Sequence, residues 1–175
     1  METLLFPGFA IYKNSWTSWH SVLKEDVLKG VNSLEYFTHS APGISVHNSD
    51  YYNQSAVKPY VKTVQPLIDR HYEELIKELD CQLHTASLKE IWYQQYTKGD
   101  YHGWHTHSPT TFTNIYYVDL PEGTPVTKFR MAGKEYEIEI QEGDLISFPG
   151  HLEHRSPPNK TDKIKTVISF NIDLS

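Results

Sequence analysis

Half of the ten histidines in this chain fall in two short segments. The segment GDYHGWHTH, residues 99–107, carries His102, His105 and His107, and the segment FPGHLEHR, residues 148–155, carries His151 and His154. Neutral imidazole is a protein ligand for iron, zinc, copper and nickel. A lone histidine is usually a surface or hydrogen-bonded residue, but two clusters in an ordered sequence context indicate a metal site.

The spacing selects three of these histidines as ligands. His105 and His107 are two residues apart, so on an extended segment both side chains project from one face and can reach the same ion. By the same alternation, His102 does not share that face. The third ligand must come from another strand, and His154, which follows a predicted strand and tight turn, is placed to supply it. We expect His151 on the turn or in an outer layer.

The elements that must hold these histidines are predicted from residue 88 onward. Short runs rich in β-branched and aromatic residues alternate there with turn signals. The runs are LKEIWYQQY, TTFTNIYYVDL, VTKFRM, KEYEIEI, DLISF and KTVISFNID, with Ala132-Gly133 as a hairpin turn. Strands without a helical interruption predict an antiparallel jelly-roll barrel or sandwich. The predicted fold class is therefore mainly β with supporting helices.

The supporting elements precede this β region. Residues 3–12 predict a short strand broken at Pro7, and apolar residues at helical spacing predict a helix that begins near Asn14 or Ser15 and ends at Gly30. Residues 58–79 carry the clearest helical stripe, which we expect to lie against a sheet. This stripe consists of Val61, Val64, Ile68, Tyr72, Leu75 and Leu79.

Residues 31–57 follow neither the helical nor the strand period. They form either a lid or substrate loop or a packed irregular connection. We predict a single domain over residues 1–175, in which 1–85 give helical and loop support and 86–175 form the β core that carries the metal site.

The composition excludes some classes of partner. The chain has 175 residues and a formal net charge of -6, which offers no basic surface for a nucleic-acid backbone. The single cysteine, Cys81, has no partner for an internal disulfide, and no apolar run approaches membrane-spanning length. The start of the chain does not follow the pattern of a secretory signal. The sequence therefore predicts a soluble, cytoplasmic protein; its aromatic residues are compatible with a homodimer.

Two families with a common barrel resemble these motifs. GDYHGWHTH and GDLISFPGHLEH are similar to the two motifs of cupins, but cupins usually place a glutamate soon after the second histidine, and SPTTF, residues 108–112, has none. The closer resemblance is to the iron(II)- and 2-oxoglutarate-dependent oxygenases. Within them it is closest to a small group, frequent in phages and bacteria, that carries Gly-Asp-Tyr-His-x-x-His-x-His. A tyrosine-rich strand, a Phe-Pro turn with a histidine, and a basic residue before ISFN then follow in order up to residue 171.

The resemblance implies a double-stranded β-helix in which His105, His107 and His154 bind Fe(II) and 2-oxoglutarate chelates the ion. The wider superfamily usually has a carboxylate where His107 stands. Asp100 and Glu153 are nearby in sequence and are alternative ligands. The group that carries the resemblance has histidine at this position, and His107 has the same parity as His105.

The resemblance also implies a site for the co-substrate. Its distal carboxylate needs a cation, because an unpaired buried charge is costly. Lys165 stands where the family places this arginine or lysine, and Arg130 is the alternative if Lys165 points outward, with Arg155 as a further candidate. Tyr96 resembles the tyrosine that hydrogen-bonds the co-substrate in prolyl hydroxylases.

Two further residues are expected in the same cavity. Asn114 and Tyr116 share one face of the strand that follows the first histidine motif, and we expect them to line the cavity.

The function that this implies is a dioxygenase, which hydroxylates a small-molecule or peptide substrate that the sequence does not identify. The rivals are a cupin-like metal enzyme that uses no keto acid, a zinc hydrolase with three histidines and a water, and a binding module that has lost the chemistry. Loss of co-substrate affinity in Lys165→Ala would separate the dioxygenase from the cupin-like enzyme.

Overall fold

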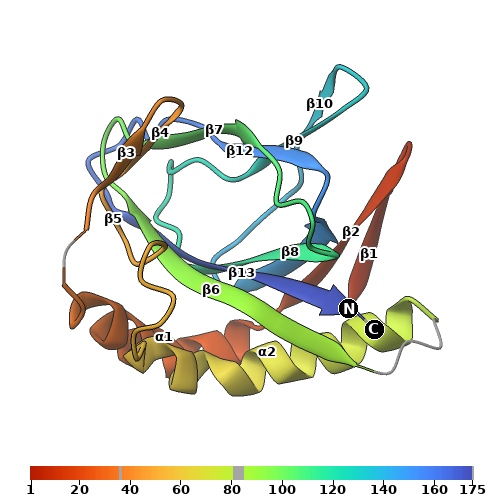
Figure 1. Cartoon of the computed structure of the whole chain (residues 1–175), viewed down its shortest axis with the longest axis horizontal. Helices are drawn as coiled ribbons and strands as arrows, with labels where there is room; N and C mark the ends of the chain where they lie inside the picture. The colour runs from red at the N-terminus through yellow and green to blue at the C-terminus, as the bar shows by residue number, and fades with distance from the viewer. Residues whose placement is uncertain (36, 81–84, 175) are drawn as a thin grey trace.

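The computed structural model describes residues 1–35, 37–80 and 85–174; Cys81 lies outside this part of the chain. Two antiparallel sheets are stacked, with two helices beneath the larger sheet (Figure 1). This is a jelly-roll core, mainly β with helical support, as the sequence predicts. Among the described helices, none combines the length and apolar character needed to cross a bilayer.

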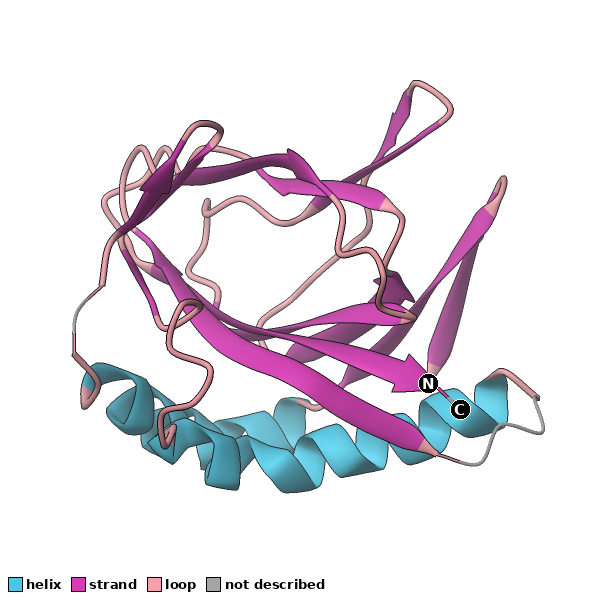
Figure 2. Ribbon diagram, in the orientation of Figure 1, coloured by secondary structure: helices cyan, strands magenta, loops and turns pink. Residues whose placement is uncertain are grey.

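Figure 2 shows the strands in two layers, and both sheets draw their strands from distant parts of the chain (Figure 1). The larger sheet, in spatial order, consists of β1 (Glu2–Phe6), β2 (Phe9–Ser15), β11 (Asp144–Pro149), β8 (Phe112–Asp119), β13 (Lys165–Leu174), β6 (Ala86–Tyr96) and β5 (Asn48–Ser49). The smaller sheet consists of β10 (Lys134–Tyr136), β9 (Lys128–Met131), β12 (Glu153–Ser156), β7 (Tyr101–His105), β4 (Ile44–Val46) and β3 (His39–Ala41).

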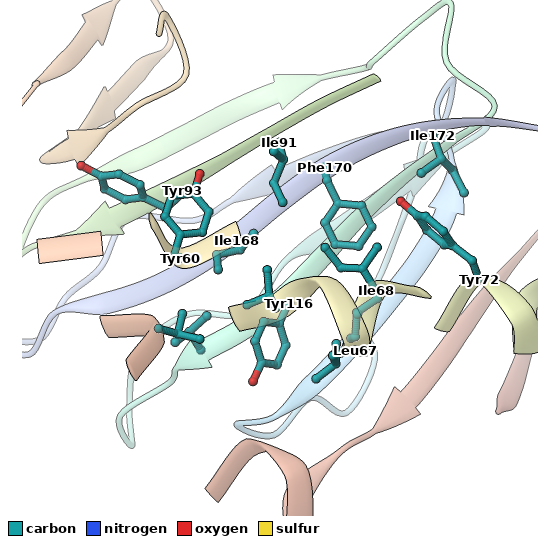
Figure 3. Close-up of a cluster of buried hydrophobic side chains, with 14 of the residues drawn as sticks. Tyr60, Leu67, Ile68, Tyr72, Ile91, Tyr93, Tyr116, Ile168, Phe170 and Ile172 are labelled. Carbon is teal, nitrogen blue, oxygen red and sulfur yellow. The ribbon is translucent and has the colours of Figure 1, made fainter. Parts of the chain in front are cut away.

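Helices α1 (Thr17–Asn32) and α2 (Pro59–Glu78) cover the outer face of the larger sheet. The predicted stripe of α2 is the face that packs, because its Ile68 and Tyr72 lie against residues of the sheet such as Phe170 (Figure 3). Leu67, which the predicted stripe did not include, is buried beside them. Burying such an apolar face supplies most of the stability of a helix in a folded domain. The expectation that this helix lies against a sheet is confirmed.

A second apolar cluster fills the space between the two sheets. It includes Ile11 from β2, Phe129 from β9 and Phe148 from β11. The larger sheet therefore has a packed layer on each face, and its central strand β8 is buried along both faces from Phe112 to Val118.

The first 85 residues contribute more than helices and loops. A hairpin, β1 and β2, adds two strands to the larger sheet where the sequence predicts one broken strand. Residues 31–57 contain β3, β4 and β5 and are not structureless, as far as the structure describes them. These strands have two or three residues each, too few to display an alternating pattern. Strand β4 pairs with β7 beside His102.

Gly30 does not end the first helix, which continues to Asn32. A Cβ atom at Gly30 would lie 2.8 Å from the backbone nitrogen of Tyr60 in α2. Gly30 therefore allows α1 and α2 to approach closely, and α1 also contacts β8.

Candidate metal centre

Three histidines converge between the sheets. His105 ends β7, His154 lies on β12, and His107 follows β7 by two residues. One ring nitrogen from each of the three lies within 4.8 Å of the others. The ring centroids of His105 and His154 are 4.2 Å apart, and that of His107 is 5.0 and 5.1 Å from them. The sequence spacing predicts this convergence.

Two backbone contacts hold the histidines in register. His154 is the direct cross-strand partner of His105 where β12 pairs with β7. His107 lies beyond the strand, and its backbone N–H donates to the carbonyl oxygen of Gly150 at 2.8 Å. A Cβ at position 150 would lie 2.3 Å from the carbonyl oxygen of Thr110, so only glycine fits this turn without a shift of the chain.

The hydrogen bonds of the three rings leave one nitrogen of each available. Nδ1 of His105 lies 2.8 Å from the carbonyl oxygen of Gly103, and Nδ1 of His154 lies 2.9 Å from that of Leu152. A carbonyl oxygen only accepts, so both Nδ1 atoms carry the proton and donate. Nδ1 of His107 faces the side-chain oxygen of Asn171 at 3.1 Å. In each ring the Nε2 lone pair remains for a ligand bond, as in metal-binding histidines.

Burial keeps these rings neutral. It lowers the pKa of His105, and burial together with the neighbouring His105 lowers the pKa of His107 to about 4. The pKa of His154, which is 3% exposed, is lowered well below its usual range by burial and by the other two rings. Neutral imidazole is the form that binds metal ions.

His102 contradicts the parity argument. Its ring stacks on that of His105, with centroids 3.7 Å apart and planes 8° apart. His154 pairs with His105 but Ser156 pairs with His102, so the register shifts between β7 and β12. This bulge removes the alternation that would have turned His102 away. His102 is therefore a wall of the site, although it is outside the metal-ligating group.

Trp92 is a second residue that sequence reasoning missed. Its ring stacks on that of His107, with centroids 5.5 Å apart and planes 10° apart. Trp92, Gln94 and Tyr96 alternate along β6 and all line the cavity beside the histidines. Trp92 lies four residues before the candidate Tyr96, so on a strand both side chains point to the same face, and this spacing predicts Trp92 in the cavity.

The two carboxylate alternatives lie elsewhere. Asp100 accepts hydrogen bonds from the Ser45 hydroxyl and the Thr97 backbone, and Glu153 forms a bidentate ion pair with Arg130. Within the residues that the structure describes, the three histidines form the only group of metal-ligating side chains close enough to share an ion.

Lys165 points inward. It is 1% exposed, and its Nζ donates to the Ser156 hydroxyl at 2.6 Å and to the Pro125 carbonyl at 3.0 Å, above the ring of Tyr96 at 4.3 Å. These partners are neutral, and in the described part of the chain no carboxylate pairs with this lysine. Burial lowers the pKa of Lys165 to about 7. Lys165 is thus a buried basic side chain that has no anionic partner among the described residues.

The alternative cations flank one indole ring. The guanidinium groups of Arg130 and Arg155 lie 4.5 and 4.6 Å from the ring centroid of Trp104. Arg130 pairs with Glu153, and Arg155 pairs with Glu135. Since both have an acidic partner, Lys165 is the better candidate for an added anion.

Asn114 and Tyr116 do not line the cavity, and this prediction is wrong. They share a face of β8, as parity requires, but that face meets the helices. Asn114 bonds to the Ser147 hydroxyl, which also contacts His71 of α2, and the Tyr116 hydroxyl bonds to His20 of α1. The opposite face of β8 lines the cavity, through Thr113 and Ile115.

Two spaces meet at the histidines. A narrow cavity of about 30 Å³ runs between the sheets to Lys165 and is lined by Tyr96, Thr127 and Ser156. A wider cleft of about 730 Å³ adjoins the same histidines and is lined by Tyr51, Tyr52 and Trp92, among others. His105 and His107 border both spaces, and His154 borders the narrow one.

Several solved structures with this architecture are prolyl hydroxylases and other 2-oxoglutarate and iron(II) oxygenases, so the chain has the fold of that class. A Pseudomonas putida prolyl-4-hydroxylase matches with a TM-score of 0.67 at 11% identity, covering 93% of this chain and 92% of that one. A prolyl hydroxylase from Trichoplax adhaerens, in complex with a hypoxia-inducible-factor peptide fragment, matches with 0.67 at 14% identity, covering 95% and 83%.

The epimerase SnoN, in complex with Fe3+, alpha ketoglutarate and nogalamycin RO, matches with a TM-score of 0.69 at 11% identity, covering 93% of this chain and 78% of that one. Identities this low establish the fold alone. No family model and no curated protein matches the sequence.

Proposed function

We propose that this protein is an Fe(II)- and 2-oxoglutarate-dependent dioxygenase that hydroxylates a small molecule or a peptide. His105, His107 and His154 would hold the ion, and Lys165 would pair with the distal carboxylate of 2-oxoglutarate. The observation that carries the proposal is the combination of three free Nε2 atoms with a buried lysine that lines the same cavity and has no carboxylate partner among the described residues.

The donor set fits this metal. Three protein ligands on one face leave positions for a bidentate keto acid and for dioxygen. When bound, Fe(II) and 2-oxoglutarate supply oxidation of a substrate C–H bond coupled to decarboxylation of the keto acid. The chain's own contribution is to bind and orient the two, and to exclude water through the ring walls of His102 and Trp92.

The buried lysine fits the co-substrate. Desolvating an ammonium group is costly unless an opposite charge lies beside it. A carboxylate that reaches Lys165 would offset this cost and restore the ordinary, protonated form of the side chain. The Tyr96 ring and the Ser156 hydroxyl flank the same end of the cavity.

The narrow cavity must widen for the co-substrate. Its volume of about 30 Å³ is far smaller than a keto acid with five carbon atoms requires. An ammonium group has three N–H donors, and two of those of Lys165 donate to Ser156 Oγ and Pro125 O, so one remains for the distal carboxylate once the surrounding side chains move apart.

The wide cleft is the proposed site for the substrate that is hydroxylated. Tyr51 and Tyr52 form one wall, with rings 5.2 Å apart, and His39 stacks on Tyr51. The Trichoplax adhaerens neighbour binds a peptide and the SnoN neighbour binds nogalamycin RO, so this architecture serves both kinds of substrate.

The test is turnover of the co-substrate. The protein is loaded with Fe(II) under anaerobic conditions and exposed to oxygen with 2-oxoglutarate, and succinate is measured. We expect oxygen-dependent succinate formation, including slow uncoupled turnover without the second substrate. No succinate across a panel of peptides and metabolites, with the metal shown to be bound, would count against the proposal.

An anaerobic spectrum separates the rivals. The dioxygenase predicts an absorption band when 2-oxoglutarate is added to the Fe(II) form, because the keto acid would chelate the ion. A cupin-like enzyme without a keto acid and a zinc hydrolase both predict no such band. Metal content after purification does not decide between them, since zinc outcompetes iron at nitrogen sites.

A further inference from the structure

The proposed metal site contains no carboxylate. All three of its ligands are imidazoles, which bind a metal ion as neutral groups, so the double charge of the ion would be less neutralised than in a site with two histidines and one acid. Two of the rings donate to neutral backbone carbonyls. The third, His107, is connected to an acidic residue through one intervening side chain.

That connection runs through Asn171. The Asn171 side chain, 3% exposed, accepts from His107 Nδ1 at 3.1 Å, and its amide nitrogen donates to the Glu90 carboxylate at 3.0 Å. Asn171 and Glu90 are direct cross-strand partners on β13 and β6, which fixes their separation. The Thr113 hydroxyl also donates to the Asn171 oxygen, at 3.2 Å.

The direction of each bond follows from Glu90. An ionised carboxylate only accepts, so the Asn171 amide must present its NH₂ group to Glu90 and its oxygen to His107. The oxygen in turn requires a proton on His107 Nδ1. Nε2 is then the unprotonated nitrogen of the ring and the one available to the ion.

We propose that Glu90 and Asn171 are positioning residues for His107 and that Glu90 supplies, through the Asn171 amide, the negative charge that a ligand carboxylate would otherwise provide. The carboxylate of Glu90 polarises the Asn171 amide, so the amide oxygen becomes a stronger hydrogen-bond acceptor. The stronger bond to His107 Nδ1 in turn makes Nε2 a stronger electron-pair donor to the ion. The inference rests on the metal-binding part of the proposed function and not on the identity of the substrate.

The nearby Asp173 differs from Glu90 in its partners. Asp173, two residues from Asn171 on β13, pairs with Lys89 and accepts from the Thr111 backbone N–H. Within the described residues, Glu90 has no such ion pair, and the Asn171 amide donates to it instead. Asp173→Asn is therefore a matched control, because it removes one carboxylate close to the site without touching the path to His107.

The experiment is an anaerobic titration of the metal-free protein with Co(II), which reports both affinity and, through the visible absorption of the ion, its coordination. Partners that hold a metal-ligating histidine typically contribute about 10–100-fold in affinity. We expect Asn171→Ala to lose about that much and Glu90→Gln to lose a smaller part, about tenfold. Asp173→Asn should bind like the unaltered protein.

A charge swap gives the sharpest test. In the double variant Glu90→Gln with Asn171→Asp, the glutamine amide donates to the new aspartate and the aspartate accepts from His107, so the charge moves one position closer to the ring. We expect Co(II) affinity and the absorption spectrum to return to those of the unaltered protein or beyond. A general loss of packing would not be rescued by a second substitution.

The outcomes separate two failures. If the unaltered protein binds Co(II) tightly and Glu90→Gln and Asn171→Ala bind it equally well, the positioning role is wrong and the proposed function stands. An equal loss in Asp173→Asn would show a general effect of surface charge and would also overturn it. If the unaltered protein binds neither Co(II) nor Fe(II), the metal site falls, and both proposals fall with it.

Discussion

His154 lies directly opposite His105 where β12 pairs with β7, and their rings approach to 4.2 Å between centroids. A strand pair thus holds two of the three candidate ligands at a fixed separation before any ion binds. The third, His107, is held by a backbone bond to Gly150, the turn that leads into β12. The site is therefore preorganised by the backbone of both histidine segments, which lowers the entropic cost of binding an ion.

Removal of one ligand histidine should weaken metal binding severely, whereas removal of a nearby histidine outside the ligand group should not. His154→Ala takes away one of three donors from a buried site, so we expect a loss of Co(II) affinity greater than the roughly 100-fold that a supporting residue contributes. His151 is exposed on the turn three residues earlier and outside the ligand group. His151→Ala should titrate normally; an equal loss in both variants would mean that the turn, and not the ligand, was responsible.

Binding of 2-oxoglutarate should weaken as the pH rises. The pKa of Lys165 is lowered to about 7 by burial, so the ammonium that would pair with the co-substrate is lost above that pH. The charged fraction of such a group falls about tenfold per pH unit above its pKa, which sets the limit for the loss of affinity. Calorimetric titration of the metal-loaded protein between about pH 6.5 and 9 measures this dependence.

The same titration with Lys165→Arg provides the control. Arginine stays protonated throughout this range, so the decline with pH should disappear. Lys163→Met, which removes an exposed lysine from the same segment, should keep the decline. An affinity of the unaltered protein that is flat across the range would show that Lys165 is not the partner of the anion.

Without co-substrate, Lys165 should destabilise the protein. Its folded-state pKa lies below the unfolded value of 10.5, so the unfolded chain binds more protons between about pH 7 and 10.5 and stability falls as the pH is lowered through that window. Lys165→Met removes the buried ammonium, and at about pH 6.5 we expect its free energy of unfolding to increase by on the order of 1 kcal/mol.

Urea unfolding in the presence of a chelator measures this effect. The advantage of Lys165→Met over the unaltered protein should shrink at about pH 9, where the folded lysine is already neutral. A variant that is less stable at both pH values would indicate that the bonds to Ser156 and Pro125 outweigh the cost of burying the charge.

Adjacent residues of β8 should have separable effects, because they lie on opposite faces of the strand. Asn114 bonds to Ser147 and to the Phe170 carbonyl on the helix-facing side, so Asn114→Ala should cost about 1–3 kcal/mol of stability and leave Co(II) affinity unchanged. Thr113 faces the cavity and donates to Asn171, so Thr113→Val should weaken Co(II) binding. Weaker Co(II) binding in Asn114→Ala together with normal binding in Thr113→Val would contradict this assignment of the two faces of β8.

The sequence alone determined the ligand types and the elements that carry them. His105 and His154 could be identified because two imidazoles on one face of an extended segment, followed by another after the end of a later predicted strand, are typical of a metal site. The stripe of α2 could be recognised because one face of that helix is buried and the other is solvated. These features depend on residue type and local period, which the chain carries directly. Lys165, in contrast, was proposed from the resemblance to the 2-oxoglutarate-dependent oxygenases.

Tertiary structure decided which side of each strand meets the cavity. Strand β8 is buried on both faces from Phe112 to Val118, so its residue types do not show which face meets the histidines and which meets the helices, and Asn114 and Tyr116 were assigned to the wrong one. The bulge that brings His102 onto His105 arises from the pairing of β7 with β12. The link from Glu90 to His107 likewise exists only because β6 and β13 are in register. Alternation along a strand tells which residues share a face, but the layers packed on either side determine what that face touches.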